Sequence, residues 1–193
     1  MAVFGYPNSG EPTMTERIVV VDRDGVVNED SDDYIKSTDE FIALPDSLEA
    51  IARLNHAGYT VMVATNQSGI ARGLFTIDTL NAIHSKLRRE LSTYGGRIDG
   101  IFFCPHGPDD HCDCRKPAPG LLYEIAKRTG RSLEGVPAVG DSLRDIQAAQ
   151  TVGASPVLVK TGKGMRTLQQ THGLKGVPVF NNLADYVNTL LEG

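Results

Sequence analysis

The segment Arg17–Glu29 reads RIVVVDRDGVVNE and decides the fold. Its run of β-branched residues, Ile18–Val21, is typical of a strand that is buried on both faces. We expect this strand to end at Asp22–Gly25, because Asp and Gly are poor strand formers. Open parallel sheets bind ligands where the carboxyl ends of their strands emerge. Two carboxylates this close repel unless a cation or a shared proton holds them, so the segment predicts a Mg²⁺ site. Taken alone, it is equally compatible with an acidic surface turn.

The composition is that of an ordinary soluble globular protein. The 193 residues, 40% hydrophobic and 22% charged, suffice for one well-buried domain. A net charge of −5 argues against a nucleic-acid or acidic-membrane surface, and no apolar run reaches membrane-spanning length. Residues 1–16 lack the basic start and apolar core of a signal peptide, and they predict a flexible arm. The three cysteines favour a metal site in a reducing cytoplasm over a disulfide framework.

Strand and helix patterns alternate along the chain. Further strands are expected at 59–64, 98–104, 136–139, 156–160 and 177–180, and helices at 48–55, 77–94, 120–128, 143–152 and 183–191. Candidate N-caps are Asp46 or Ser47, Thr76, and Asn181 or Asn182. The alternation predicts an α/β fold, a three-layer Rossmann-like open parallel sheet with helices on both faces. No linker divides the order, so we expect a single domain over residues 17–193.

Reactive side chains follow three of these strands. Asp22 and Asp24 follow the first, Thr65 the second and Asp141 the fourth, while Lys116 lies in a loop before a helix. The carboxyl ends of parallel strands share one edge, so these residues can converge. Phosphoryl transfer needs such a set: a nucleophile, a metal, donors for the phosphoryl oxygens and a proton donor.

Each residue of the set can be given a role on chemical grounds. Asp22, at the strand end, is the expected nucleophile that forms an aspartyl-phosphate. Asp24, two residues further, is the expected proton donor and later the base that activates water. Asp141 would add a second carboxylate to Mg²⁺, and Thr65 would donate its hydroxyl and backbone N–H to the phosphoryl group. Lys116 would offset the acidic charge and orient Asp22.

Non-catalytic interpretations stay open for several of these residues. Thr65 could be a turn residue, Lys116 a solvated lysine and Asp141 the N-cap of the helix at Leu143. Asp145, one helical turn after Asp141, is interpreted first as a surface residue and second as support for Lys116 or for a metal-bound water.

A second metal site is predicted in the loop before residue 120. Cys104, His106, Cys112 and Cys114 form the pattern C-x-H-x₅-C-x-C, which suits a closed, structural and tetrahedral Zn²⁺ site. His111 competes with His106, but it is adjacent to Cys112, so both could ligate only awkwardly. A chance cluster of free thiols and a redox pair are the alternatives.

In their order, these motifs resemble the haloacid dehalogenase-like phosphatase superfamily. The matching pieces are D-R-D-G-V at Asp22–Val26, A-T-N at Ala64–Asn66, the lysine of C-R-K-P at Cys114–Pro117 and G-D-S-L-R-D at Gly140–Asp145. The resemblance implies Asp22 as the nucleophile and Asp24 as the acid/base. It also implies Mg²⁺ on the Asp22 side chain, the Asp24 backbone carbonyl and Asp141. The intervals after Asp24 and Thr65 are too short for a large cap domain.

A finer pattern resembles the D-glycero-D-manno-heptose 1,7-bisphosphate 7-phosphatases. The resemblance lies in T-N-Q-S-G-I-A-R-G at Thr65–Gly73, the zinc loop, C-R-K-P-A-P-G at Cys114–Gly120 and V-K-T-G-K-G at Val159–Gly164. It implies Mg²⁺-dependent removal of the 7-phosphate from a small sugar substrate in the cytoplasm. The product would enter ADP-heptose synthesis for the lipopolysaccharide core, and the enzyme would be a monomer.

The same resemblance implies substrate contacts. Phosphate and sugar contacts are expected from Thr65, Asn66, Gln67 and Ser68, and recognition is expected from Arg115. Further sugar contacts are expected from the loop at 30–34, with Asp30 and Asp33. This loop is one residue longer than the usual pattern, and Ser142 stands where a lysine is often found.

Three other functions remain as alternatives. A histidinol-phosphate phosphatase shares the zinc loop, but N-Q-S-G-I-A-R-G is the sugar-bisphosphate version of the turn after Thr65. A signalling receiver domain also uses paired acids, a Thr and a Lys, but its phospho-accepting aspartate follows an internal strand and it has no zinc loop. A purely structural zinc protein would show no phosphatase activity.

Overall fold

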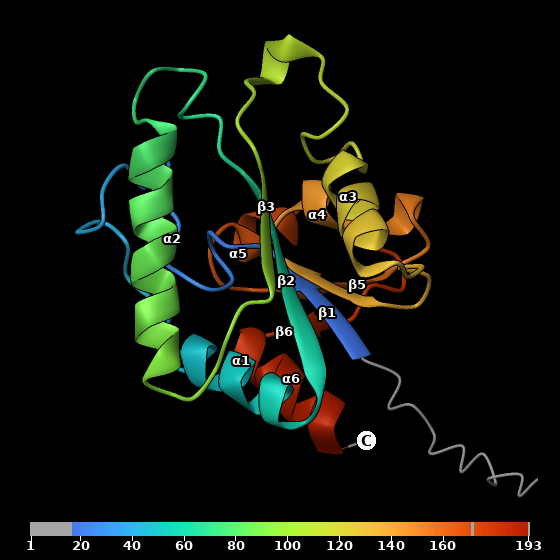
Figure 1. Cartoon of the computed structure of the whole chain (residues 1–193). Coiled ribbons are helices and arrows are strands. Elements are labelled where there is room, and N and C mark those ends of the chain that lie inside the picture. The colour runs from blue at the N-terminus through green and yellow to red at the C-terminus, as the bar shows by residue number, and fades with distance from the viewer. Residues whose placement is uncertain (1–16, 171, 193) are drawn as a thin grey trace, which may run out of the picture.

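One parallel sheet of six strands organises the molecule (Figure 1). The computed structural model describes residues 17–170 and 172–192, so the predicted arm at 1–16 lies outside the described residues. The strand order is β3-β2-β1-β4-β5-β6. The strands are β1 Arg17–Val21, β2 Tyr59–Asn66, β3 Gly100–Cys104, β4 Pro137–Gly140, β5 Ser155–Val159 and β6 Val179–Phe180. The strand order reverses between β1 and β4, which is where open α/β sheets form a ligand crevice.

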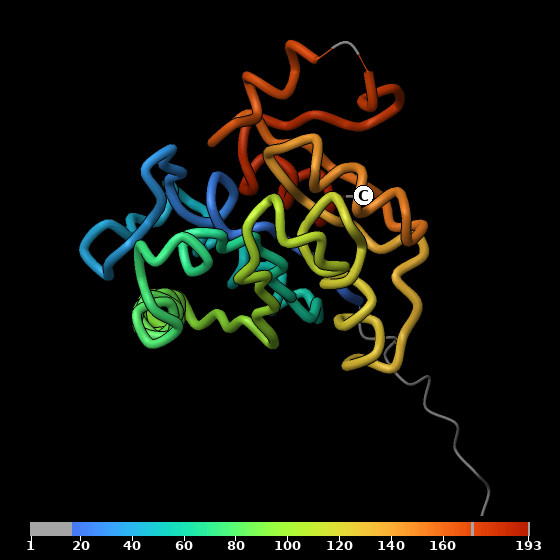
Figure 2. Tube along the Cα trace, turned by 90° about the horizontal axis from the view of Figure 1, so that it is seen from above, coloured from blue at the N-terminus to red at the C-terminus, as the bar shows by residue number. Residues whose placement is uncertain are grey.

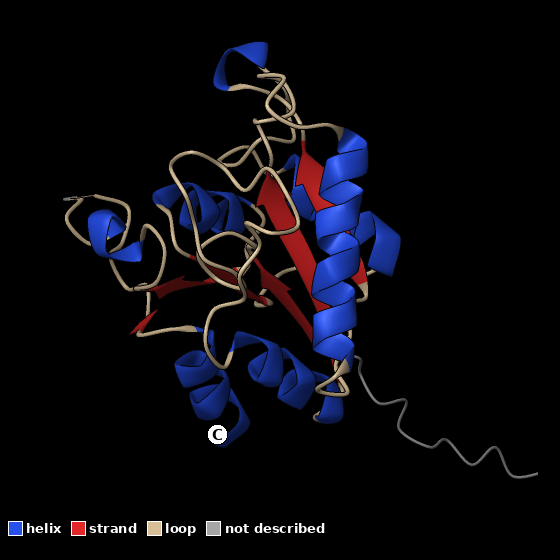
Figure 3. Ribbon diagram, turned by 90° about the vertical axis from the view of Figure 1, so that its left-hand side faces the viewer, coloured by secondary structure: helices blue, strands red, loops and turns tan. Residues whose placement is uncertain are grey.

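Helices cover both faces of this sheet, as the alternating pattern predicted. They are α1 Ser47–His56, α2 Ile77–Ser92, α3 Gly120–Thr129, α4 Leu143–Thr151, α5 Gly164–Thr167 and α6 Leu183–Glu192, with a 3₁₀ helix at Pro108–Asp110. One core contains buried side chains of α1, α2 and α6, and a second contains side chains of α3 and α4. Figure 3 shows the strands enclosed between these helical layers. None of the described helices has the length and apolar character needed to cross a bilayer.

The residues of β1 explain why this strand is central. Val19 and Val21 belong to the core with α1, α2 and α6, whereas Ile18 and Val20 belong to the core with α3 and α4. Successive side chains of a strand point to opposite faces, so a continuous apolar run is needed when both faces are covered. The three-layer α/β architecture predicted from the alternation of strands and helices is confirmed.

Two of the three predicted helix caps are observed. The Thr76 hydroxyl accepts a hydrogen bond from the Thr79 N–H at 3.1 Å, and the Asn182 side chain accepts one from the Asp185 N–H at 2.8 Å. At α1, Asp46 takes the predicted N-cap position but does not make the predicted capping bond. Its backbone is left-handed, and Ser47 instead donates its hydroxyl to the carbonyl of Val27 at 2.7 Å.

Two features of the fold differ from the sequence prediction in ways that affect the site: the end of β2 and the helix α5. β2 continues through Thr65 and Asn66, which pair with Phe103 and Cys104 of β3, so these polar residues belong to the strand and not to a turn. The short helix α5 was missed, because four residues between Gly164 and Thr167 are too few to show helical periodicity. Figure 2 shows the molecule from above. In this view, the segments that follow the strands lie around the carboxyl edge of the sheet.

Candidate active site

A cleft of about 260 Å³ opens at the carboxyl edge of the central strands. Its lining includes the whole set expected for phosphoryl transfer, namely Asp22, Asp24, Thr65, Lys116 and Asp141. The expectation that strand ends would bring these residues together is therefore met. Their individual catalytic roles remain predictions.

Asp22 is held firmly at the tip of β1. Its backbone N–H donates to the Val139 carbonyl of β4 at 2.8 Å, and its Oδ1 lies 3.0 Å from the Lys116 Nζ. Burial raises the pKa of the Asp22 carboxyl to about 7, and the nearby charges of Asp145 and Asp24 add to this effect, although Lys116 opposes it. Its carboxylate thus lies in an environment that favours binding a cation.

Lys116 is the cationic centre of the cleft. Its Nζ lies 2.5 Å from Asp145 Oδ1 and donates to the Ala64 carbonyl at 2.6 Å. Burial would lower the pKa of this amine, but Asp145 and Asp22 outweigh that effect and raise it, so Lys116 remains charged. Asn66 fixes the Lys116 backbone, because its side chain both donates to and accepts from it at 3.0 Å. The solvated-lysine interpretation is wrong, since Lys116 is only 4% exposed.

Asp141 follows β4, and its carboxylate has an oxygen within 4.8 Å of an Asp22 carboxylate oxygen. Its Oδ2 accepts a hydrogen bond from the Lys163 N–H at 2.7 Å. Burial raises the pKa of the Asp141 carboxyl to about 8, with further contributions from Asp145 and Asp22. Asp141 does not cap α4; Ser142 occupies that position, and its N–H donates to Asp145 at 3.0 Å. Of the two interpretations of Asp145, support for Lys116 is the one that the contacts show.

Two glycines allow the chain to approach Asp141 closely. Gly25 has φ +82° and Gly162 has φ +54°, a region that favours glycine. A Cβ atom at Gly25 would lie 2.1 Å from Asp141 Oδ2, and one at Gly162 would lie 2.2 Å from it. The Asp141 carboxylate is therefore enclosed by backbone that no larger residue could form.

These carboxylates fit a hard divalent cation. Ligand oxygens of Asp22, Asp141 and Asp145 all lie within 4.8 Å of one another. The Lys116 ammonium group pairs with Asp22 and Asp145, and Mg²⁺ prefers oxygen ligands. Asp145 is engaged by both Lys116 and Ser142, and the assignment of the ion to the Asp22 and Asp141 side chains stays a prediction. The contribution of the Asp24 backbone carbonyl stays a prediction.

The Asp24 carboxylate lies apart from that group and is surrounded by donors. Arg23, Asn28 and Gln67 all donate to it. Burial would raise the pKa of Asp24, but the charge of Arg23 and these hydrogen bonds outweigh it and lower the pKa. Gln67 also donates to the Thr65 hydroxyl at 2.9 Å, so one amide links the predicted acid/base to the predicted phosphoryl ligand.

The predicted substrate contacts are only partly placed at the cleft. Gln67, Ser68, Arg115 and Asp30 line it. Asn66 lines it too, but both ends of its amide contact the Lys116 backbone, so we infer that it positions Lys116.

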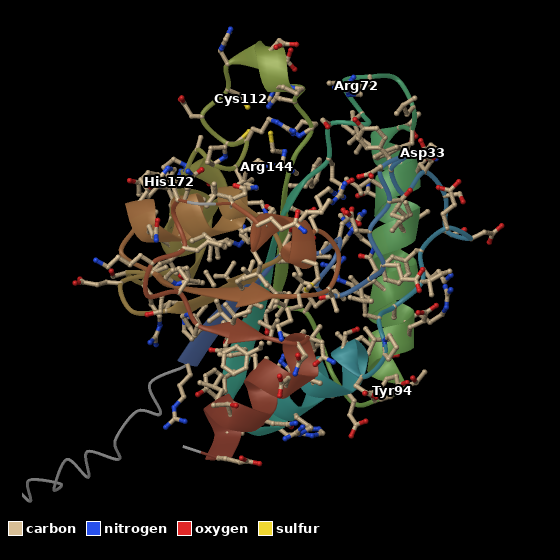
Figure 4. All side chains as sticks on the ribbon, turned by 180° about the vertical axis from the view of Figure 1, so that it is seen from behind. Asp33, Arg72, Tyr94, Cys112, Arg144 and His172 are labelled. Atoms are coloured by element: carbon tan, nitrogen blue, oxygen red, sulfur yellow. The ribbon has the colours of Figure 1, made fainter. Side chains whose placement is uncertain are left out.

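Asp33 was predicted to contact the sugar, but the structure places it outside the cleft. Its side chain is exposed and is not part of the cleft lining. The Tyr34 N–H donates to the Ser31 carbonyl at 3.1 Å, and this turn directs Asp33 to the surface. In Figure 4, Asp33 lies toward the side of the molecule, away from Arg144.

Two cationic cleft residues were missed. Lys163 precedes α5 and forms an ion pair with Asp30, and Arg144 lies in the first turn of α4. Lys163 is the second lysine of V-K-T-G-K-G, so this motif could have indicated a role for it at the site. No sequence pattern indicated Arg144, because an arginine in a first helical turn is usually a surface residue.

The predicted zinc ligands form one cluster. The three sulfur pairs of Cys104, Cys112 and Cys114 are 3.1–3.6 Å apart, and His106 Nδ1 lies 3.3 Å from the Cys114 sulfur. A tetrahedral ion with Zn–S bonds of about 2.3 Å separates its sulfur ligands by about 3.8 Å, so a small expansion admits Zn²⁺. His111 is exposed and outside the cluster. Cys112 lies in the loop beyond the strand ends in Figure 4.

Replacing one of these ligands is expected to cost stability more than chemistry. Cys112→Ser should abolish zinc binding and lower the melting temperature by about 10 °C, because the ion holds a loop that has little regular structure. Metal content and thermal unfolding measure both effects. His111→Gln, in the same loop, is the control and should change neither. Full zinc content in Cys112→Ser would contradict the ligand assignment.

Comparisons with known proteins agree with this geometry. The HAD-hydrolase-like family model matches residues 113–186, and the polynucleotide kinase 3 phosphatase model matches residues 16–146. The chain is 57% identical to the D-glycero-β-D-manno-heptose-1,7-bisphosphate 7-phosphatase of Bordetella bronchiseptica, covering 91% of this chain and 98% of that one. It is 52% identical to the enzyme of the same name from Pseudomonas aeruginosa, covering 93% and 100%.

Solved structures give the same result. The crystal structure of the B. bronchiseptica D,D-heptose 1,7-bisphosphate phosphatase, in complex with magnesium and phosphate, aligns with a TM-score of 0.89 over 91% of this chain and 98% of that one, at 57% identity. The corresponding enzyme of Burkholderia thailandensis aligns with a TM-score of 0.74 at 46% identity, over 92% and 100%. The chain is therefore a phosphoric monoester hydrolase and belongs to the D-glycero-β-D-manno-heptose-1,7-bisphosphate 7-phosphatase family of haloacid dehalogenase-like hydrolases.

Proposed function

We propose that this protein removes the 7-phosphate of D-glycero-β-D-manno-heptose 1,7-bisphosphate through an aspartyl-phosphate on Asp22. The observation that carries the proposal is the position of the Asp22 carboxylate. It lies at the tip of β1, 3.0 Å from the Lys116 ammonium and beside Asp141 in the cleft. The choice of the sugar and of the β anomer rests on the names of the relatives.

In the first step, Asp22 attacks the 7-phosphorus and the sugar oxygen departs. Lys116 orients the attacking carboxylate, and Thr65 and Ser68 lie where they can hold phosphoryl oxygens. When bound at Asp22 and Asp141, Mg²⁺ offsets the negative charge of the phosphoryl group. Asp24, which must be protonated for this step, passes that proton to the departing sugar oxygen, since an alcohol leaves poorly as an alkoxide.

In the second step, water hydrolyses the aspartyl-phosphate. Asp24, now a carboxylate, takes a proton from the attacking water, which is the reverse of its first role. Gln67, which donates to both Asp24 and Thr65, keeps this base beside the phosphoryl-binding side of the cleft. The free Asp22 carboxylate is restored and phosphate departs.

The cleft suits a substrate with a second phosphate. Its lining includes the cationic side chains of Arg115, Arg144 and Lys163 as well as the carboxylates of Asp22 and Asp141. We infer that these cations bind the part of the bisphosphate that is not transferred. We further propose that the protein acts as a monomer in the cytoplasm, where reducing conditions keep the cysteine cluster available for zinc.

A substrate comparison tests this proposal. With Mg²⁺ present, phosphate release from the β bisphosphate should have the highest kcat/KM, followed by the α anomer and then by histidinol phosphate. Equal or faster turnover of histidinol phosphate would reverse the substrate assignment while leaving the phosphatase chemistry intact. A phosphorylated protein that persists without turnover would instead support the receiver-domain alternative.

A further inference from the structure

Arg23 lies between the two aspartates of the active site but does not line the cleft. The side chain has 0% exposure, which is rare for a charged residue. The other cations of the site, including Lys116, Arg115 and Lys163, all contribute to the cleft lining. Arg23 therefore has no direct contact with a molecule bound there, and its role must be sought in the protein groups that it touches.

The guanidinium of Arg23 binds both oxygens of the Asp24 carboxylate. Nη2 lies 2.7 Å from Oδ1 and 3.0 Å from Oδ2, and Nε lies 3.1 Å from Oδ1. Asn28 donates to Oδ1 at 2.9 Å and Gln67 to Oδ2 at 2.8 Å. A planar guanidinium that bridges two oxygens fixes the orientation of a carboxylate as well as its position. Asp24 is thus held in one orientation by three side chains.

His84, on the buried side of α2, holds Arg23 in turn. Its Nε2 lies 3.3 Å from Arg23 Nη1, and the side chain is 4% exposed. Arginine always carries its proton, so Arg23 donates and His84 Nε2 accepts, which places the histidine proton on Nδ1. Burial and the charges of Arg23 and Arg88 lower the pKa of His84 to about 3, in agreement with a neutral ring.

Stability alone does not explain this arrangement. A buried ion pair contributes little net stability, because the cost of removing two charges from water offsets their attraction. An apolar side chain at position 23 would fill the same space without that cost. What the pair provides, and an apolar residue could not, is a fixed orientation of the acid/base carboxylate.

We propose that Arg23 and His84 are positioning residues that aim the Asp24 carboxylate at the leaving-group oxygen. His84 fixes the position of Arg23, and Arg23 fixes the orientation of Asp24. A residue of α2 thus orients the proton donor without touching the substrate. The inference rests on the proposed function, in which Asp24 protonates the departing sugar oxygen.

Leaving-group dependence distinguishes this role from a structural one. A sugar oxygen needs a proton to depart, whereas p-nitrophenolate leaves without one. The value of kcat/KM reports only the steps up to the departure of the leaving group. His84→Leu should therefore lower kcat/KM about tenfold for the sugar bisphosphate, and by less than about twofold for p-nitrophenyl phosphate. His84→Gln should restore most of the loss, because its amide oxygen can accept from Arg23.

Two further variants keep the test decisive if His84→Leu folds poorly. Arg23→Lys retains the charge but not the two-point grip on Asp24, so it should show the same selective loss. Leu87→Ala, one turn along α2 and fully buried, is the control that weakens the same helix without touching Arg23. It should lower the melting temperature and affect both substrates equally.

Each result has a defined meaning. Equal losses on both substrates in His84→Leu and Arg23→Lys, as in Leu87→Ala, would overturn the inference and assign the pair a structural role. Failure of His84→Gln to differ from His84→Leu would also overturn it. Asp24→Asn separates the inference from the function on which it rests, because it should show the largest selective loss. Without that loss, the acid role of Asp24 itself is wrong.

Discussion

Asp22→Asn is expected to abolish turnover, with kcat falling by about 10⁴-fold or more, because an amide cannot attack phosphorus as a carboxylate does. Asp22 is the group of the cleft that lies at the tip of the central strand with Lys116 and Asp141 beside it. Phosphate release and the absence of a phosphorylated protein after rapid acid quenching would measure the effect. Near-normal activity in this variant would show that another residue is the nucleophile.

The same substitution should not destabilise the fold. Burial raises the folded-state pKa of Asp22 to about 7, so ionising this carboxyl opposes folding as the pH rises above the ordinary aspartate pKa. This cost is complete once the pH exceeds the folded-state value. With metal removed by a chelator at pH 8, Asp22→Asn should therefore melt at the wild-type temperature or above it. Asp33→Asn, an exposed change of the same kind in a nearby loop, is the control and should retain both activity and stability.

Lys116→Met is expected to impair both activity and stability. The ammonium group lies within 3.0 Å of Asp22 and 2.5 Å of Asp145, and it also donates to the Ala64 carbonyl. Breaking one side of a buried ion pair costs about 3–5 kcal/mol, because the remaining charges stay buried without compensation. Activity should fall by about 10³-fold, since Asp22 loses the group that orients it. Chemical unfolding and phosphate release measure the two losses.

The stability loss of Lys116→Met should depend on pH. Burial raises the pKa of Asp22, which pairs with Lys116, to about 7. Asp22 takes up a proton as the pH falls, so the deficit should be largest above pH 7 and smaller near pH 5 without metal. Lys127→Met, an exposed lysine whose distance to Glu124 is 4.0 Å, is the control and should have little effect at any pH. A pH-independent deficit would contradict this account of the charge cluster.

Much of the site was predictable because it depends on where strands end. The β-branched run before Asp22 identifies a central strand, and all parallel strands present their carboxyl ends at one edge. That rule alone brings Asp22, Asp24, Thr65 and Asp141 to the same cleft. The zinc cluster was predictable for a related reason, since its four ligands lie within eleven residues and a short loop cannot separate them widely.

Other features depend on contacts between distant segments. Asp33 was expected at the substrate, but a turn that begins at Ser31 directs it outward. Asn66 was expected to bind substrate. Its amide instead contacts the backbone of Lys116, which is 50 residues further along the chain, through both its oxygen and its nitrogen. Nothing near Arg23 in the sequence indicated His84, which is 61 residues further along the chain.

The sequence by itself predicted the alternation of strands and helices apart from α5, the identity of the central strand and two sets of candidate metal-binding side chains. These follow from local patterning, because periodicity and spacing act over only a few residues. The tertiary structure decided which groups each carboxylate faces: Lys116 and Asp141 beside Asp22, Arg23 and Gln67 on Asp24, and Lys163 on Asp141. Those pairings set the charge and orientation of the reacting groups, and they arise only when packing brings remote segments together, since hydrogen bonds and ion pairs act over a few ångströms.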